Sequence, residues 1–122
     1  MACQLNCVVR SGVLSAVVSG RCTGPRSGFD AAWIGRAILE QASSQAIRRV
    51  LIDVRRLGDR LGSLGELALS AAVPAPGYRV AVLDTAEHDS YYALHEATAR
   101  RRGIELRGFS DSREAASWLL AA

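Results

Sequence analysis

The sequence predicts a single α/β domain over residues 1–122, and three observations support this prediction. The length suits one domain with its own hydrophobic core, and no linker, internal repeat or charge run divides the chain. Apolar runs typical of strands alternate with segments of helical periodicity, as in sheets whose parallel strands are joined by right-handed crossovers. Two runs rich in β-branched residues at the start indicate a hairpin. The expected order is β-β-α-β-α-β-α-β-α, in a mixed sheet with helices packed on it.

The first two strands are expected to form an antiparallel hairpin. The runs LNCVVR (residues 5–10) and GVLSAVVSG (residues 12–20) are rich in β-branched side chains, and Ser11 and Gly12 lie at their junction. A serine and a glycine between two such runs are typical of a tight turn. The hairpin would form an edge of the sheet with unpaired backbone groups, so homodimerisation through this edge is an expected interaction.

Three further apolar runs predict the parallel strands. RRVLIDVRR (residues 48–56) is apolar at its centre and flanked by arginines, which is typical of a central strand covered on both faces. YRVAVLD (residues 78–84) and IELRGF (residues 104–109) have the same character. Because helical segments separate these three runs, we expect them to pair in parallel.

Four segments have the pattern of helices that pack on a sheet. The first follows Phe29, where apolar residues recur at helical spacing. A short helix is expected over about 64–72 and ends at VPAPG, because its prolines cannot donate an amide proton. The third helix is expected over about 87–102, closed by a glycine. The last lies in SDSREAASWLLAA (residues 110–122), which opens with an aspartate and a glutamate spaced as a capping pair.

The composition favours a soluble globular protein and argues against several functional classes. Hydrophobic residues make up 49% of the chain, and the formal net charge is +3. All fifteen basic residues are arginine, so any anion site must use guanidinium groups. The basic run ARRRG (residues 99–103) lacks interleaved aromatic residues and fits the last turn of a helix, so no nucleic-acid partner is expected. No signal peptide or transmembrane run is evident, and the expected location is the cytoplasm.

The cysteines indicate neither a disulfide framework nor a metal site. Cys3, Cys7 and Cys22 are odd in number and form no C-x-x-C pair. The first two lie on one face of the first strand, about 13 Å apart by strand rise, which is too far for a disulfide. We therefore expect reduced thiols in the core or at an interface, with no metal and no cofactor.

Asp53 lies inside the apolar run 48–56, where a carboxylate needs hydrogen bonds or an arginine partner. The expected arrangement is a structural ion pair with Arg55 or Arg79. The alternative is a functional carboxylate whose pKa is raised by burial in the strand.

The segment RRLGDRLGSLGELAL, which joins a strand to a helix, is the first candidate site. Its glycines can expose backbone amides to an anion at the helix N-terminus, helped by Arg55, Arg56 or Arg60. Alternatively, Ser63 and Glu66 are spaced as a capping box, which satisfies two helix amides without any ligand. A third interpretation makes Ser63 a phosphoacceptor, because a phosphate there would meet arginines and a helix N-terminus.

The segment DTAEHDSYYALHE is the second candidate site. Asp84 closes a strand at the edge where open α/β sheets bind ligands, and Thr85 can cap the next helix. On that helix His88, Tyr91 and His95 share one face. The two histidines and the aspartate are a candidate metal-binding or acid–base set. The separation of the histidines, about 10 Å of helix rise, favours instead a polar, half-buried helix face.

The end of the chain, IELRGFSDSREAASWLL, has a recognisable pattern of a strand, a Phe-Ser turn and a helix of the form Glu-Ala-x-x-Trp-Leu. The residues of this pattern are Phe109, Glu114, Ala115, Trp118 and Leu119. Together with VLIDVRRL, YRVAVLD and the order of elements, it resembles the stand-alone bacterial SpoIIAA-like domains of the STAS-like fold. The resemblance covers the chain from about residue 12 onward.

This resemblance implies a small α/β domain without a catalytic centre of its own, acting in regulation or ligand binding. Anti-sigma-factor antagonists of this fold carry Asp-Ser-Ser-Gly before their second helix, and phosphorylation of the second serine switches partner binding. Ser63 takes that place here, with Leu61, Gly62 and Leu64 around it instead of the motif. Related SpoIIAA-like domains resemble Sec14-type lipid carriers, which implies an apolar ligand as an alternative.

Three functions follow from these observations. The first is a non-enzymatic regulatory module that binds a protein partner or a small anionic ligand around loop 55–66 and the start of the helix after Asp84. The second is a protein that binds a lipid or another apolar small molecule, with LGELALSAAVPAP as a mobile lid. The third is a small hydrolase-like enzyme using His88, His95 and Asp84, and the lack of a nucleophile beside a base at credible spacing argues against it.

Overall fold

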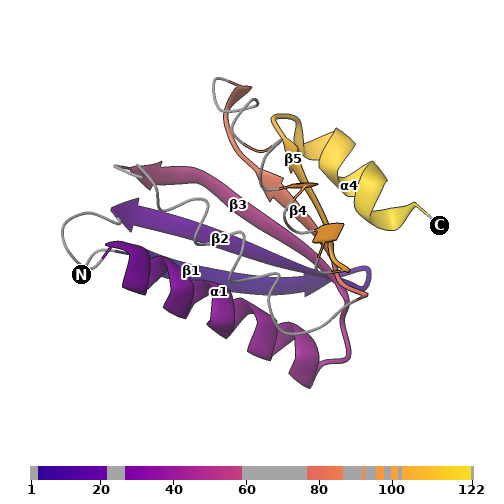
Figure 1. Cartoon of the computed structure of the whole chain (residues 1–122), viewed down its shortest axis with the longest axis horizontal. Helices are drawn as coiled ribbons and strands as arrows, with labels where there is room; N and C mark the ends of the chain where they lie inside the picture. Colours follow the sequence, from indigo (N-terminus) through magenta and orange to yellow (C-terminus); the bar gives the residue numbers. More distant parts are fainter. Residues whose placement is uncertain are drawn as a thin grey trace.

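The computed structural model contains a five-stranded sheet with helices on both of its faces (Figure 1). The structure describes residues 3–21, 27–58, 77–86, 92, 96, 97, 100, 101 and 103–121. The elements are β1 (Cys3–Arg10), β2 (Val13–Arg21), α1 (Ser27–Ser44), β3 (Arg49–Gly58), β4 (Arg79–Leu83), β5 (Glu105–Phe109) and α4 (Ser112–Leu120). Their order confirms the α/β class that the sequence predicts.

The sheet is mixed, and its strands lie in chain order, β1-β2-β3-β4-β5. β1 pairs antiparallel with β2, and the three later pairs are parallel, as expected. The hairpin turn has positive φ at both Ser11 (53°) and Gly12 (75°), which is the conformation of a type I′ turn. The first and last strands of the chain, β1 and β5, are therefore the two edges of the sheet.

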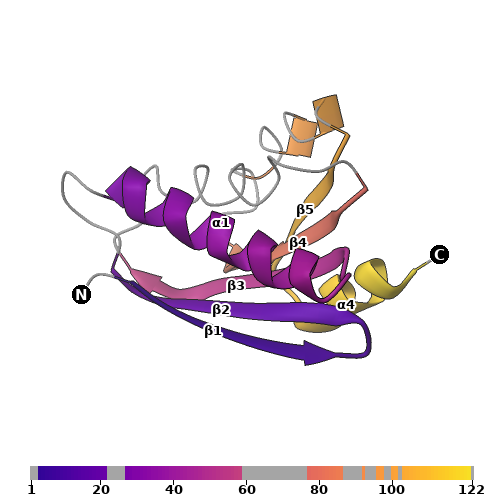
Figure 2. The ribbon, with the colours of Figure 1, turned by 90° about the horizontal axis from the view of Figure 1, so that it is seen from below.

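The two faces of the sheet are covered by different helices, as Figure 2 shows. On one face, Ile38 of α1 packs with Ile52 of β3 in the larger apolar cluster, and both side chains are fully buried. On the opposite face, Leu119 of α4 packs with Ala81 of β4 in a smaller cluster. Alternation along each strand supplies both clusters, because successive side chains point to opposite faces.

Two further helices are expected between β3 and β4 and between β4 and β5. The first, expected over 64–72, lies outside the described residues. Within the second, expected over 87–102, residues 92, 96, 97, 100 and 101 are described, and all are helical. Gly103 follows with a φ of 78°, as expected for a glycine that closes a helix. In the described part of the chain, no helix is both long enough and apolar enough to cross a membrane.

Both ends of α4 are held by side chains. Asp111 is the N-cap, and its carboxylate accepts hydrogen bonds from the second and third N–H groups of the helix at 2.8 and 3.3 Å. At the other end, Nη1 of Arg79 in β4 donates to the carbonyls of Trp118 and Ala121, both at 2.9 Å. A cation at a helix C-terminus also complements the helix dipole. Arg79 therefore fixes α4 against the sheet.

Candidate functional site

The two predicted site segments begin at the same edge of the sheet, where β3 extends past the end of β4. Asp53 and Leu83 are the last paired residues of these strands, whereas β3 continues beside β2 as far as Gly58. The chain after β4 leaves the sheet at Asp84 and Thr85. The first residues of the two segments, Arg55 and Asp84, thus lie at the same end of the sheet, where the parallel strands have their carboxyl ends.

A β-bulge in β3 explains how Asp53 is used. Val17 pairs with Asp53 and Ser19 with Arg56, so β3 contains one residue more than β2 over this stretch. A bulge leaves a backbone amide off the ladder. Here the N–H of Arg55 donates to Oδ1 of Asp53 at 3.0 Å. The guanidinium of Arg55 donates to the same carboxylate, with 3.1 Å from Nε to Oδ1 and 2.8 Å from Nη2 to Oδ2.

The ion pair with Arg55 is one of the two arrangements that the sequence predicts for Asp53. The other expected partner, Arg79, is engaged with α4 instead. Partial burial by itself raises the pKa of Asp53, but the hydrogen bonds from Arg55 and the charges of Arg55 and Arg56 outweigh it, so this pKa is lowered. The alternative of a carboxylate with a raised pKa is therefore wrong, because the arginine stabilises the ionised form.

Arg55 and Arg56 are exposed cations at this edge. The side chain of Arg55 remains 47% exposed despite its ion pair, and Arg56 is also exposed. Arg60 and Ser63, the other candidates in this segment, lie outside the described residues. Helix capping, anion contact and phosphorylation therefore stay predictions from the sequence.

Asp84 is buried rather than directed to solvent, with only 1% of its surface exposed. Its carboxylate accepts hydrogen bonds from the hydroxyl of Tyr92 and from the backbone N–H of Thr85, both at 2.7 Å. Its own N–H donates to the carbonyl of Phe109 in β5 at 2.9 Å. A buried carboxylate needs such partners. These contacts make Asp84 the residue that positions the chain after β4, with Thr85 half-buried beside it.

Tyr92 and Glu96 are residues of this second segment that sequence reasoning missed. They lie one helical turn apart, and both contact Gly108 of β5. A Cβ atom at Gly108 would lie 2.6 Å from the Cβ and Cγ atoms of Tyr92, so the ring rests directly on the strand backbone. The N–H of Gly108 donates to Oε2 of Glu96 at 3.0 Å. The signal in the sequence was the i, i+4 spacing of the two residues and a glycine within a strand.

His88, Tyr91 and His95 lie outside the described residues, so the metal and acid–base hypotheses that use them stay predictions. Among the described residues, no three His, Cys, Asp or Glu side chains are grouped as metal ligands. Cys7 is a half-buried free thiol packed against the cluster under α1, and burial raises its pKa. A raised pKa disfavours the reactive thiolate, as expected for a core cysteine.

No family model and no curated protein sequence matches this chain. Several solved structures match it, and two of them do so along nearly its whole length. One is the crystal structure of an anti-sigma factor antagonist from Mycobacterium paratuberculosis, with 15% identity and a TM-score of 0.62, covering 98% of this chain and 96% of that chain. The other is an uncharacterized protein of the DUF3478 family from Shewanella loihica PV-4, with 15% identity and a TM-score of 0.54, covering 97% and 94%.

The second of these structures is described as having a SpoIIAA-like fold. The present chain shares that fold, a mixed five-stranded sheet with an antiparallel β1 and β2 and parallel remaining strands. This confirms the resemblance on which the sequence-based expectation of fold rests.

Proposed function

We propose that this chain is a non-enzymatic regulatory module that binds a protein partner at the edge where β3 and β4 end. The observation that carries the proposal is the exposure of Arg55 and Arg56 there, with Asp53 holding Arg55 through three hydrogen bonds. An arginine already held in place loses less side-chain entropy when it binds. The similarity to an anti-sigma factor antagonist supports a regulatory role.

The partner surface that suits this edge is acidic, because the exposed side chains at the end of β3 are arginines. Asp53 occupies only some of the five N–H donors of the Arg55 guanidinium. Ser63 follows in the same sequence segment. A phosphate on Ser63 would add negative charge to the segment that carries these arginines, and would weaken its attraction for an acidic partner. Binding would then be switched by modification, as the resemblance implies.

The test compares the proteins captured from a lysate of the native host by the wild-type chain and by three variants. Arg56→Ala removes an exposed cation from the site, and Ser63→Asp adds a negative charge to the segment. Arg36→Ala, on the exposed side of α1, removes the same charge elsewhere and is the control. We expect a partner that the wild type and the control retain and that both site variants lose.

The purified partner then gives a quantitative answer by calorimetry. Arg56→Ala is expected to raise its Kd about tenfold or more, which corresponds to about 1.4 kcal/mol. Binding that is unchanged in both site variants would place the interaction on another surface of the molecule.

The alternatives of lipid binding and catalysis gain no support from the described residues. An apolar ligand needs an enclosed apolar cavity, whereas the concave surfaces found among these residues are lined partly by arginine and glutamate. An enzyme using Asp84 needs a carboxylate free to act, and this one is buried against Tyr92 and Thr85. Native mass spectrometry tests the lipid alternative directly, through any lipid that co-purifies.

A further inference from the structure

Among the described strands, β5 pairs only with β4, so one side of its backbone has no partner strand. The N–H of Glu105 and the carbonyl of Phe109 form hydrogen bonds toward the β4 side. Because the backbone groups of successive strand residues point alternately to the two sides, Leu106 and Gly108 direct theirs outward. Glu96 accepts from the N–H of Gly108. No described residue forms a hydrogen bond with the outward groups of Leu106, so this part of the edge can pair with an added strand.

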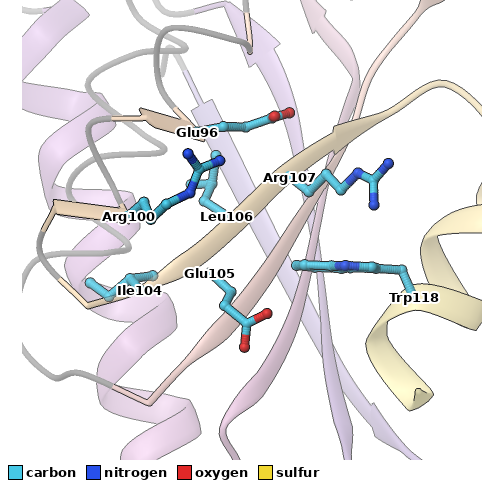
Figure 3. A pocket seen from close by; sticks show the side chains of 7 residues that line it. All are labelled: Glu96, Arg100, Ile104, Glu105, Leu106, Arg107 and Trp118. Atoms are coloured by element: carbon cyan, nitrogen blue, oxygen red, sulfur yellow. The ribbon is translucent and has the colours of Figure 1, made fainter. Parts of the chain in front are cut away.

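A groove of about 320 Å³ lies over this open edge (Figure 3). Leu106 of β5 is among the residues that line it, and its two walls belong to opposite faces of the sheet. Arg100, from the helical residues between β4 and β5, lies on one wall. Arg107, a residue of β5, and Trp118, a residue of α4, lie on the other wall. The groove therefore lies beside β5, with side chains from both faces of the sheet along it.

The charged side chains around this groove are positive in sum, because Arg79, Arg100 and Arg107 outnumber Glu96 and Glu105. Glu105 forms an ion pair with Arg79, with 3.5 Å between its Oε1 and Nη2, and Glu96 accepts a backbone hydrogen bond. The ion pair offsets the charge of Glu105, whereas the hydrogen bond from a neutral backbone N–H leaves Glu96 as one negative charge in the groove. Arg100 and Arg107 are exposed, and neither forms an ion pair with a described carboxylate. Each wall of the groove therefore presents one available guanidinium group.

A shallower hollow of about 600 Å³ continues from the groove along α4, and Arg107 and Trp118 border both. The ring centroids of Phe109 and Trp118 are 5.5 Å apart, and the guanidinium of Arg107 lies 5.5 Å from the centroid of Phe109. Arg113 and Glu114 also line this hollow, one with each sign of charge. Arginine and aromatic side chains are enriched among the residues that dominate the binding energy of protein interfaces.

We propose that β5 binds an acidic segment of a partner protein, which docks in an extended conformation and adds a strand to the sheet. The backbone groups of Leu106 pair with this segment, as in other cases of strand addition. Successive side chains of an extended segment point to opposite sides. Two adjacent acidic residues therefore reach Arg100 on one wall and Arg107 on the other, and an apolar residue nearby covers Trp118.

This surface is distinct from the edge at which β3 and β4 end, so the inference goes beyond the proposed function and does not depend on it. Charge determines the partner class, because a basic segment would meet Arg100 and Arg107 and be repelled. Glu96 determines the register of the added strand against β5. It already accepts the hydrogen bond from the N–H of Gly108, so the backbone groups of Leu106 are the ones left to pair with the segment.

The test uses a terminally blocked octapeptide with adjacent glutamates at its centre and valine or threonine elsewhere. Two control peptides carry arginine in place of the glutamates, or N-methyl groups on alternate amides that prevent strand pairing. Binding is followed in nitrogen–proton NMR spectra of the full chain. We expect the acidic peptide to shift the amides of Leu106 and Gly108 and the indole of Trp118, and to slow hydrogen exchange at Leu106. Neither control peptide should bind comparably.

Protein variants locate the interaction. Arg100→Gln and Arg107→Gln are each expected to weaken peptide binding at least fivefold, whereas Arg36→Gln on α1 should leave it unchanged. Binding of the arginine or N-methylated peptide with equal strength would overturn the proposal, as would shifts that map to another edge or the absence of binding at millimolar peptide. Protection of Leu106 that grows with protein concentration alone would overturn it too, because a second copy of the chain would then occupy this edge.

Discussion

The ring of Tyr92 rests on the backbone of Gly108, so closely that a Cβ atom at position 108 would lie 2.6 Å from both the Cβ and the Cγ of the tyrosine. Tyr92 is 2% exposed, and its hydroxyl is bound to Asp84 at 2.7 Å. The ring therefore cannot move aside at low cost. This contact fastens the segment between β4 and β5 onto the edge strand.

Gly108→Ala is expected to lower the free energy of unfolding by about 1–3 kcal/mol, as overpacking does in other cores. Urea denaturation measures the change. The matched comparison repeats the substitution in a Tyr92→Ala background, where the added methyl group meets open space and should cost little. An equal cost in both backgrounds would show that the strain does not come from the tyrosine.

Tyr92→Phe removes the hydroxyl that donates to the buried carboxylate of Asp84. We expect a loss of about 1–2 kcal/mol in the free energy of unfolding, because a buried acceptor loses one of its partners while Thr85 still donates to it. Tyr78→Phe removes the hydroxyl of another buried tyrosine and is the control. Thermal unfolding of both variants gives the comparison, and equal losses would argue against a special role for the bond to Asp84.

The Asp53–Arg55 ion pair makes stability depend on pH. The pKa of Asp53 is lowered in the folded protein, so its contribution is present above the unfolded pKa and is lost as the pH falls through the folded pKa. Asp53→Asn keeps an acceptor for the Arg55 amide but removes the charge. We expect it to cost about 0.5–1 kcal/mol at neutral pH, because Arg55 is half exposed and solvent screens the pair. Urea titrations from neutral pH to about pH 2 should show this difference vanish.

Arg79 links β4 to the C-terminal end of α4. Arg79→Gln is expected to lower the free energy of unfolding by about 1–3 kcal/mol, because two carbonyls lose a charged donor. Amide hydrogen exchange should become faster in α4 before it does so in β4. Arg49→Gln is the control, since Arg49 is the residue of β3 paired in register with Arg79. Unchanged exchange in α4 would contradict the role assigned to Arg79.

Homodimerisation through β1 is a prediction from the sequence that the structure makes testable. β1 is an edge strand, and its Val8 and Val9 are 49% and 41% exposed. In a hairpin with a two-residue turn, the residues flanking the turn pair through hydrogen bonds, which directs the N–H of Val9 outward. Val9→Pro removes that donor and is expected to give monomers, whereas Val9→Thr keeps it and should leave dimers. Sedimentation velocity over a concentration series decides, and a monomeric wild type would contradict the prediction.

The sheet could be predicted from the sequence because its signals are local. The turn at Ser11 and Gly12, the apolar centre of residues 48–56 and the N-cap Asp111 each depend on a few neighbouring residues. Parallel pairing then followed from the helical segments between the strands.

The side-chain partners depend on contacts between distant residues, and prediction from the sequence was weaker there. The pKa of Asp53 is lowered because a bulge places the Arg55 amide and guanidinium on one carboxylate. Tyr92 packs on the backbone of Gly108, and this contact joins a helical residue to a strand that comes later in the chain. No local pattern predicts the bond from Arg79 to a helix terminus about forty residues later.

The order of the strands in the sheet is also the order in which the ribosome makes them. Each new strand pairs with the strand made just before it, at the edge of the sheet already formed. No strand has to insert between two strands already paired. Such a sheet can assemble during translation from its N-terminal side. The groove along β5 exists only after residues 104–121 have been synthesised. A partner that recognises this groove would therefore distinguish completed sheets from nascent ones.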